Sequence, residues 1–474
     1  MKKVLLSVAA LLLSGGLALA DGEISVTAQD QQAVGVTIYN NNLALVKDHR
    51  KISLPQGVQT LAFREVSAQI KPETALMNGG DFQVLEQNFE YDLLTPQSLL
   101  RRYVGREVTL VKRHPTTGEE QSTQAKVLSA GDGVVLQVGN RIETEITGRL
   151  VYPDVPAALR DRPTLTMQVD SGKDGVRDVE LSYLTSGLSW QADYVAELNA
   201  TDDRLNLSGW VTLTNESGAR YPQARLQLVA GDVNVAQREM EPRAMMKQAM
   251  AVGMGPAPAP MAQESMFEYH LYTLGRPTDI GENQKKQVAL LEADGVACRK
   301  ELLIAGQNHY YSAQVGEIGR KMKAGVFVEL KNDKESGLGL PLPGGVVRVY
   351  KKDGGGFLQF VGEDKVDHTP EKEVVRLHLG DAFDVTADKR QTDFKKIKGS
   401  GPYNYVFESA YEIQLKNAKK EQVVVRVQEP LPGDWEILEE SGPHRKESAQ
   451  TASWQVAVPA MESARLTYRV RVKY

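Results

Sequence analysis

The chain has 474 residues, a formal net charge of −5, 41% hydrophobic residues and a single cysteine. This composition is typical of a folded globular protein, and the length predicts two to four domains of about 100–200 residues each. The mildly acidic balance argues against a nucleic-acid partner, and the lone cysteine excludes an internal disulfide framework and a structural zinc site built on several thiolates.

The first twenty residues have the three parts of a secretory signal peptide. Lys2 and Lys3 form the positive end, Val4–Leu13 the apolar stretch, and Ala18–Ala20 the small-residue cleavage site. We predict cleavage after Ala20 and a periplasmic or secreted protein. No later segment holds the ~18 consecutive apolar residues that a membrane helix needs, so we expect no transmembrane span after signal removal.

Alternation of apolar and polar residues with period two dominates the rest of the chain. The clearest case is one face of the last strand: Ala464, Leu466, Tyr468, Val470, Val472 and Tyr474. Glycine and proline, 41 and 21 residues, punctuate many short segments of this kind. The pattern predicts an all-β, multi-domain fold of tandem immunoglobulin-like β-sandwiches with a small SH3-like β-barrel insert.

Turn residues and local composition predict the domain boundaries. Thr95 followed by Pro96 marks the start of the one clear helix, and five short strands separated by turns follow between about 104 and 153. The predicted segments are a signal peptide (1–20), an N-terminal β module (21–92), the SH3-like barrel insert (93–154), a β-sandwich (163–235), a Met/Pro/Ala-rich linker (237–266), a β-rich module (267–400) and a C-terminal immunoglobulin-like sandwich (401–474).

The methionine-rich linker contains a candidate metal site. Met246, Met250 and Met254 recur at every fourth position, which on a helix would place three thioethers on one face. Thioethers are soft ligands that select Cu(I), so a Cu(I)-binding periplasmic protein is one alternative. Gly255 and Pro256 oppose a helix here, and we therefore favour a linker and expect no metal or other cofactor.

A second polar stretch, residues 362–371, is the best candidate for catalysis. Asp364 and His368 lie in it, together with Glu363, and Asp384 follows after a strand. Such groups can act in general acid/base catalysis, which leaves open a hydrolase that acts on an envelope polymer. The alternative that we favour is that Gly-Glu-Asp and His-Thr-Pro are turns in which Asp and Thr bond their own backbone.

Several motifs spread over the second part of the chain resemble one exported bacterial family. They are Tyr183–Trp190 with Tyr194, Leu226–Asp232, Tyr269–Leu274, Leu340–Tyr350, Gly362–Asp364 with His368–Pro370, Gly380–Val385, and Glu429–Trp435. The family is domain of unknown function 4139, which is related to the mucoidy-inhibitor proteins, and the resemblance covers residues 165 to 474. This chain lacks the central coiled coil of those relatives and carries the barrel-like insert instead. The resemblance implies a fold and an exported location but no catalytic residue.

These observations predict an exported, envelope-associated binding or scaffold protein of unknown ligand, with no catalysis expected. Its partner would be another envelope protein or an envelope polymer, and the candidate contact loops are 352–356, 362–371 and 430–435. Trp435 is the candidate binding residue, because an exposed tryptophan is a favoured interface anchor. The hydrolase alternative places Asp364, His368 and Asp384 at its centre.

Overall fold

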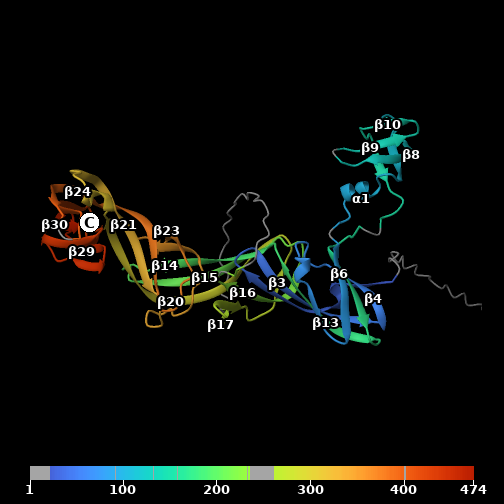
Figure 1. The fold of residues 1–474 in the computed structure, drawn as a ribbon, viewed down its shortest axis with the longest axis horizontal. Helices are drawn as coiled ribbons and strands as arrows, with labels where there is room; N and C mark the ends of the chain where they lie inside the picture. Colours follow the sequence, from blue (N-terminus) through green and yellow to red (C-terminus); the bar gives the residue numbers. More distant parts are fainter. Residues whose placement is uncertain are drawn as a thin grey trace, which may run out of the picture. The chain divides into compact units, whose positions relative to one another are not determined.

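The computed structural model describes residues 22–90, 92–131, 133–156, 159–231, 233–234, 261–399 and 402–474. The predicted all-β fold is confirmed, since these residues form thirty strands, one α-helix and three 3-10 helices (Figure 1). The 3-10 helices are η1 (Ala28–Asp30), η2 (Pro72–Thr74) and η3 (Asn308–Tyr311). None of the helices in the described ranges is long and apolar enough to cross a membrane. The predicted signal peptide lies outside the described residues.

The chain folds into two compact units, and each is discontinuous in sequence. The N-terminal unit comprises residues up to Ser189 together with Thr214–Leu228 and Arg276–Lys285. The C-terminal unit comprises Trp190–Leu213, Val229–Gly275 and Lys286–Tyr474. The polypeptide passes between the units several times because its strands pair with partners that are distant in sequence.

Besides the insert, the N-terminal unit contains a four-stranded sheet and six strands of an eight-stranded sheet. In order across the sheet, the first consists of β1 (Glu23–Val26), β4 (Gly57–Arg64), β12 (Thr164–Ser171) and β6 (Phe82–Glu90), with β1 parallel to β4. The second consists of β16 (Tyr221–Ala230), β2 (Gln31–Tyr39), β3 (Leu43–Leu54), β13 (Gly175–Thr185) and β5 (Leu76–Asn78), with β19 (Thr278–Ile280) paired to β16.

The predicted insert forms a separate five-stranded antiparallel sheet with its own core. Its strands, in order across the sheet, are β10 (Arg141–Glu143), β9 (Val135–Val138), β8 (Glu120–Ser129), β7 (Glu107–Arg113) and β11 (Arg149–Val151). The predicted helix is confirmed as α1 (Pro96–Arg102), with Thr95 as its N-cap. In the described part of the chain β10 and β11, of three residues each, are the two edges of this sheet and do not pair with each other, so it is not a closed barrel.

One long sheet makes up most of the C-terminal unit. Its strands in order are β23 (Leu358–Val366), β22 (Gly345–Lys352), β14 (Leu188–Leu198), β15 (Arg204–Asn215), β20 (Gln284–Ala305), β21 (Glu317–Lys331), β24 (Val374–Lys398), β25 (Tyr405–Asn417), β30 (Ser463–Lys473) and β27 (Asp434–Glu440). β26 (Val423–Pro430) pairs with β20 and β29 (Thr451–Val458), and β28 (Arg445–Ser448) pairs with β29. A hairpin of β17 (Ala262–Met266) and β18 (Tyr269–Thr273) also belongs to this unit.

The period-two patterns correctly predict which side chains are buried. Leu466, Tyr468, Val470 and Val472 of β30 are at most 2% exposed, and the opposite face of this strand carries charged residues. These residues join a C-terminal core in which the Trp454 ring stacks on that of Tyr468, with centroids 4.7 Å apart. Figure 1 shows β29 and β30 beside the ends of β21 and β24 around the C-terminus.

Several observed pairings differ from the predicted segments. The strands of the predicted 163–235 sandwich belong to three sheets, because β12 pairs with β4, β13 with β3, and β14 with β22. The core of the predicted 401–474 sandwich includes earlier residues such as Leu302 and Val385. The end of the predicted 237–266 linker is strand β17. In each case the strand's hydrogen-bonding partner is remote in sequence, which local patterns do not reveal.

Candidate functional site

A surface hollow of about 240 Å³ lies over three neighbouring strands of the C-terminal unit. It is lined by residues from β20, β21 and β24: Leu303, Ile304, Ala305, Met322, Lys323, Gly325, Phe327, His378 and Asp381. Gly325 has no side chain in the middle of a strand, which leaves the hollow open. A Cβ atom added to Gly325 would lie 3.0 Å from Cε2 of Phe327 and 3.6 Å from Nε2 of His378.

A large bulge in β24 forms one wall of the hollow. Lys323 pairs with Thr386 and Gly325 pairs with Asp381, so residues 382–385 stand opposite the single residue Ala324. Such bulges re-aim side chains at the edge of a regular ladder. Here the bulge places Asp381 at the hollow, while Ala382 and Val385 remain buried in the core.

Two stacked rings form the apolar wall. The Phe327 and His378 rings lie 4.8 Å apart between centroids with an interplanar angle of 29°. The Arg376 guanidinium lies 4.0 Å from the Phe327 centroid, in cation–π contact. Arg376 forms ion pairs with Glu301 at 2.7 Å and with Glu329 at 3.0 Å. These ion pairs hold the guanidinium over the Phe327 ring.

Three polar side chains at the hollow are available to a ligand. Lys323, His378 and Asp381 are exposed, and in the part of the chain that the structure describes their side-chain polar atoms have no hydrogen-bond or ion-pair partner. Together they offer an ammonium donor, an imidazole and a carboxylate acceptor around an apolar surface. Ligand sites have this composition, mostly apolar with a few convergent polar groups.

Asp364, a predicted catalytic residue, supports the hollow through the backbone. Its Oδ2 accepts a hydrogen bond from the His378 N–H at 2.7 Å, and its Oδ1 accepts one from the Lys365 N–H at 2.8 Å. Gly362 on the same strand has φ +151°, and a Cβ atom there would lie 2.6 Å from the Leu379 carbonyl oxygen. The Gly-Glu-Asp motif therefore fixes the backbone of β24 beside the hollow.

The other predicted catalytic residues have separate contacts. His368 Nδ1 accepts a hydrogen bond from the Gly344 N–H at 3.0 Å, and Glu363 pairs with Arg348 at 3.2 Å. Asp384 lies half-buried in the bulge, and its backbone carbonyl accepts from the Ala418 N–H at 2.8 Å. Across the described ranges no group of three or more His, Cys, Asp or Glu side chains has metal-binding geometry. The hydrolase role of Asp364, His368 and Asp384 stays a hypothesis.

The remaining predicted site residues are Trp435 and three methionines. Trp435 is half-buried against the C-terminal core, its indole N–H donates to the Ala449 carbonyl at 2.7 Å, and the Lys446 ammonium lies 4.8 Å from its ring. Its role as an exposed anchor stays a prediction, with much of the ring already engaged within the chain. Met246, Met250 and Met254 lie outside the described residues.

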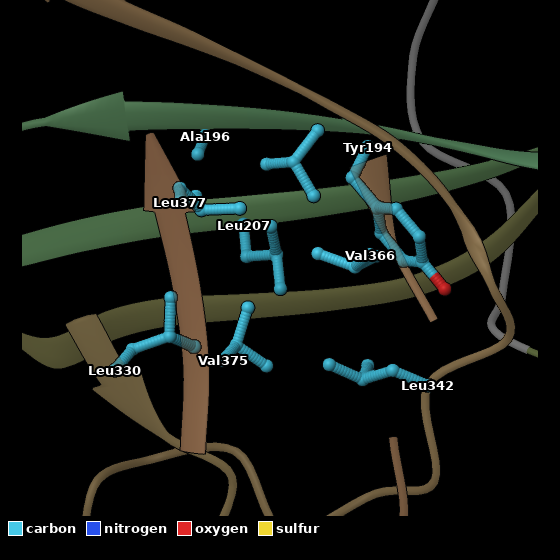
Figure 2. Close-up of a pocket in the computed structure, with 9 residues that line it drawn as sticks. Tyr194, Ala196, Leu207, Leu330, Leu342, Val366, Val375 and Leu377 are labelled. Atoms are coloured by element: carbon cyan, nitrogen blue, oxygen red, sulfur yellow. The ribbon is translucent and has the colours of Figure 1, made fainter. Parts of the chain in front are cut away.

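A small cavity lined by buried side chains of the same unit is too small for a ligand. Figure 2 shows it among apolar side chains that come from six strands and one loop: Tyr194, Ala196, Leu207, Leu330, Leu342, Val347, Val366, Val375 and Leu377. Its volume is about 10 Å³, no more than the space for one water. The Tyr194 hydroxyl donates to the Pro343 carbonyl at 2.8 Å, so its polar atom is satisfied. We interpret this cavity as a packing defect of the core.

Four residues of the hollow are not among the predicted site residues: Lys323, Gly325, Phe327 and His378. The available signal is Gly325, which interrupts the β21 pattern just before the alternating Val326, Val328 and Leu330. A glycine inside a strand often marks a bulge or a place where another group approaches closely. Joining it to His378 requires the pairing of β21 with β24, which no local pattern supplies.

The fold and the hollow define a class of protein: an all-β chain of several sheets with one small, mixed apolar and polar surface site. The family model described as domain of unknown function (DUF4139) matches residues 179–474, and the chain belongs to this family. A search of curated proteins finds no match to the chain. All the residues of the hollow lie within the matched region.

Proposed function

We propose that this protein is an exported binding protein of the cell envelope and that the hollow binds a saccharide unit of an envelope polymer. The observation that carries the proposal is the pair of stacked rings, Phe327 and His378, beside the unpartnered polar groups of Lys323 and Asp381. Sugar rings present an apolar C–H face and a rim of hydroxyls. The hollow offers an aromatic wall, in which the Phe327 ring lies between His378 and Arg376, and separate donor and acceptor groups.

The size and exposure of the hollow support one ring-sized unit rather than a large ligand. Its 240 Å³ falls just below the range of about 300–1,000 Å³ that is usual for drug-sized ligands. Because the hollow is open at the surface, a polymer chain can continue beyond the bound unit. Fixed walls also limit the ordering cost of binding, since Arg376 and Asp364 already hold Phe327 and the His378 backbone.

An oligosaccharide array followed by titration tests the proposal. We expect the mature protein to bind a subset of bacterial surface oligosaccharides, and Phe327→Ala and Asp381→Asn to lower the affinity at least about tenfold, or about 1.4 kcal/mol. Phe357→Ala is the matched control, because this phenylalanine is 72% exposed and lies outside the hollow. Loss of binding in the control, or binding that Phe327→Ala leaves unchanged, would reject the hollow as the site.

A scaffold role with a protein partner is the second candidate, and the β22–β23 hairpin supports it. Phe357, Leu358, Phe360 and Val361 are 72%, 50%, 55% and 39% exposed, and they adjoin the predicted contact loop 352–356. Clustered exposed apolar side chains often mark an interaction surface. In an envelope pull-down, Phe360→Ser should reduce the capture of such a partner, whereas Phe327→Ala should not.

Export is part of the proposal and rests on the three-part N-terminus. N-terminal sequencing of protein purified from the envelope fraction should begin at Asp21, because cleavage is expected after Ala20. Protein that retains Met1 and stays with the cytosolic fraction would contradict the proposed export.

The hydrolase alternative predicts that His368→Ala abolishes turnover of an envelope polymer without changing thermal stability, whereas a pure binding protein has no turnover to lose.

A further inference from the structure

The C-terminal core encloses a lysine and a glutamate that contact each other directly. The Lys389 and Glu429 side chains are 1% and 0% exposed, and Nζ of Lys389 contacts Oε1 of Glu429. Lys389 lies on β24 and Glu429 on β26, strands that are not hydrogen-bonded neighbours in the sheet. The contact therefore joins two strands that the backbone ladder does not link.

Two tyrosines complete the surroundings of the pair. The Tyr310 hydroxyl lies 2.6 Å from Lys389 Nζ and donates to Glu429 Oε2 at 2.7 Å, and the Tyr311 hydroxyl donates to the same oxygen at 2.8 Å. The Gln307 N–H donates to the Tyr310 hydroxyl at 2.7 Å and fixes it between the two groups. Gly306 closes the site, because a Cβ atom there would lie 2.0 Å from Glu429 Oε2.

The full burial of Lys389 and Glu429 makes an ordinary salt bridge between them costly. Removing two charges from water costs several kcal/mol per ion, and exchange of a proton to give a neutral amine and a carboxylic acid removes that cost. Burial lowers the pKa of Lys389, against the opposing effect of Glu429, and burial also raises the pKa of Tyr310. A neutral, desolvated lysine amine is a nucleophile, and it lies against a carboxyl group.

We propose that Lys389 and Glu429 are joined by an amide cross-link that forms when this domain folds. In the neutral pair the Nζ lone pair attacks Cδ of the carboxylic acid, and the N–C bond forms. One proton moves from Nζ through the Tyr310 hydroxyl to Oε2, which already carries the acid proton. The C–Oε2 bond then breaks and one water leaves, so the step needs no oxidant or other reactant.

The surrounding side chains assist each part of this condensation. The hydroxyl of Tyr310 touches both the nitrogen that loses a proton and the oxygen that gains it. The hydrogen bond from Tyr311 fixes Oε2, the oxygen that takes the second proton and leaves as water, while the electron pair that the attack displaces onto Oε1 restores the C=O bond. Holding the two reactants in one geometry replaces a slow bimolecular condensation by an intramolecular one. A covalent tie between two strands that are not hydrogen-bonded to each other would stabilise a chain whose single cysteine excludes an internal disulfide.

Tryptic peptide mapping of the folded full-length protein, after denaturation, tests the cross-link. Cleavage after Arg376, Arg390, Arg426 and Arg445 yields the peptides 377–390 and 427–445. We expect them as one branched species, lighter by one water than their sum, with fragment ions that locate the bond at Lys389 and Glu429. Separate peptides of full mass, with cleavage after Lys389, would overturn the proposal, and this test needs no variant.

Three controls separate the proposed chemistry from artefacts. Lys389→Met should release both peptides, and chain dissolved from inclusion bodies that never folded should also lack the link. The buried Arg50–Asp48 pair should remain unlinked in the same digest, because a guanidinium is not a nucleophile.

The role of Tyr310 in the proton transfer has its own test. Tyr310→Phe should slow cross-linking during refolding at least about tenfold. An unchanged rate would remove Tyr310 from the mechanism.

Discussion

At the residue scale, the buried charges of the N-terminal unit are paired with good geometry. The Arg50 side chain is 1% exposed, its Nε and Nη2 donate to Asp48 Oδ2 at 3.0 and 2.7 Å, and its Nη1 donates to the Val26 carbonyl at 2.9 Å. Removing one partner of a buried pair leaves an uncompensated charge. The stability of this unit should therefore depend strongly on the Arg50–Asp48 pair.

Asp48→Ala should lower the free energy of unfolding of the N-terminal unit by about 3–5 kcal/mol, because Arg50 would stay buried without its carboxylate. Urea denaturation followed by circular dichroism measures the change. Glu120→Ala is the control, since its ion pair with Arg149 is exposed and should contribute less than about 1 kcal/mol. Equal effects of the two substitutions would show that burial of the Arg50 pair is irrelevant to stability.

Cys298 is the second residue with a measurable consequence. Burial raises its thiol pKa to about 11, with smaller contributions from the carboxylates of Asp202 and Asp203. Only the thiolate reacts with alkylating agents, so at pH 8 roughly one thiol in a thousand should be reactive. Iodoacetamide labelling of the native protein should be slow and should accelerate up to about pH 11, while the denatured chain reacts with a midpoint near about 8.5. A native midpoint near that of the denatured chain would contradict the burial effect.

At the scale of elements, the insert between β6 and β12 is separable. Glu90 at the end of β6 pairs with Thr164 at the start of β12, so the two ends of the inserted segment meet. The insert also has its own core, formed by α1 and strands of its sheet: Leu100, Tyr103, Val108, Leu110, Ala125, Val127, Ala130 and Leu136. An element with adjacent ends and an independent core can be removed with little effect on the host sheet.

Replacing residues 91–163 by an Asn-Gly turn should leave the rest of the chain folded. A two-residue turn of this type suits the antiparallel pair that β6 and β12 already form. We expect a loss of about 1–2 kcal/mol in the N-terminal unit, since the replacement removes Arg160 and its partly buried ion pairs with Glu23 and Glu90. Circular dichroism and thermal melting measure the outcome. Insoluble protein, or a loss of cooperative unfolding, would contradict the assignment of a separable insert.

At the scale of the whole molecule, local sequence patterns predict elements well and assembly poorly. The alternation at 205–213 and 466–472 predicts buried faces that the structure confirms, because such faces depend only on the strand period. The pairing of β12 with β4 and of β14 with β22 depends on segments more than 90 residues apart, and period alone does not select a partner. Within the insert, β7 to β10 pair with neighbours in sequence, which local patterns indicate, whereas β11 pairs with β7.

The candidate site has the same division between local and non-local information. Asp364 stands out in the sequence because the acidic turn is local, yet its contact is with the His378 backbone on another strand. Gly325 contributes to the hollow only because β21 pairs with β24. Lys389 contacts Glu429 only because β26 lies close to β24 in the folded chain. Sites assembled across non-adjacent segments are therefore the part of the molecule that one sequence reveals least.

Calorimetric titration of Gly325→Ala tests whether the hollow above Gly325 binds a saccharide unit. The methyl group added at Gly325 would lie 3.0 Å from Phe327 Cε2 and 3.6 Å from His378 Nε2. In the control Gly35→Ala on β2, the added methyl would lie 3.8 Å from Lys47 Cβ, which is an ordinary van der Waals contact. With the best oligosaccharide from the array, we predict at least about tenfold weaker binding for Gly325→Ala and unchanged binding for Gly35→Ala. Wild-type affinity in a folded Gly325→Ala protein would show that the saccharide does not bind in this hollow.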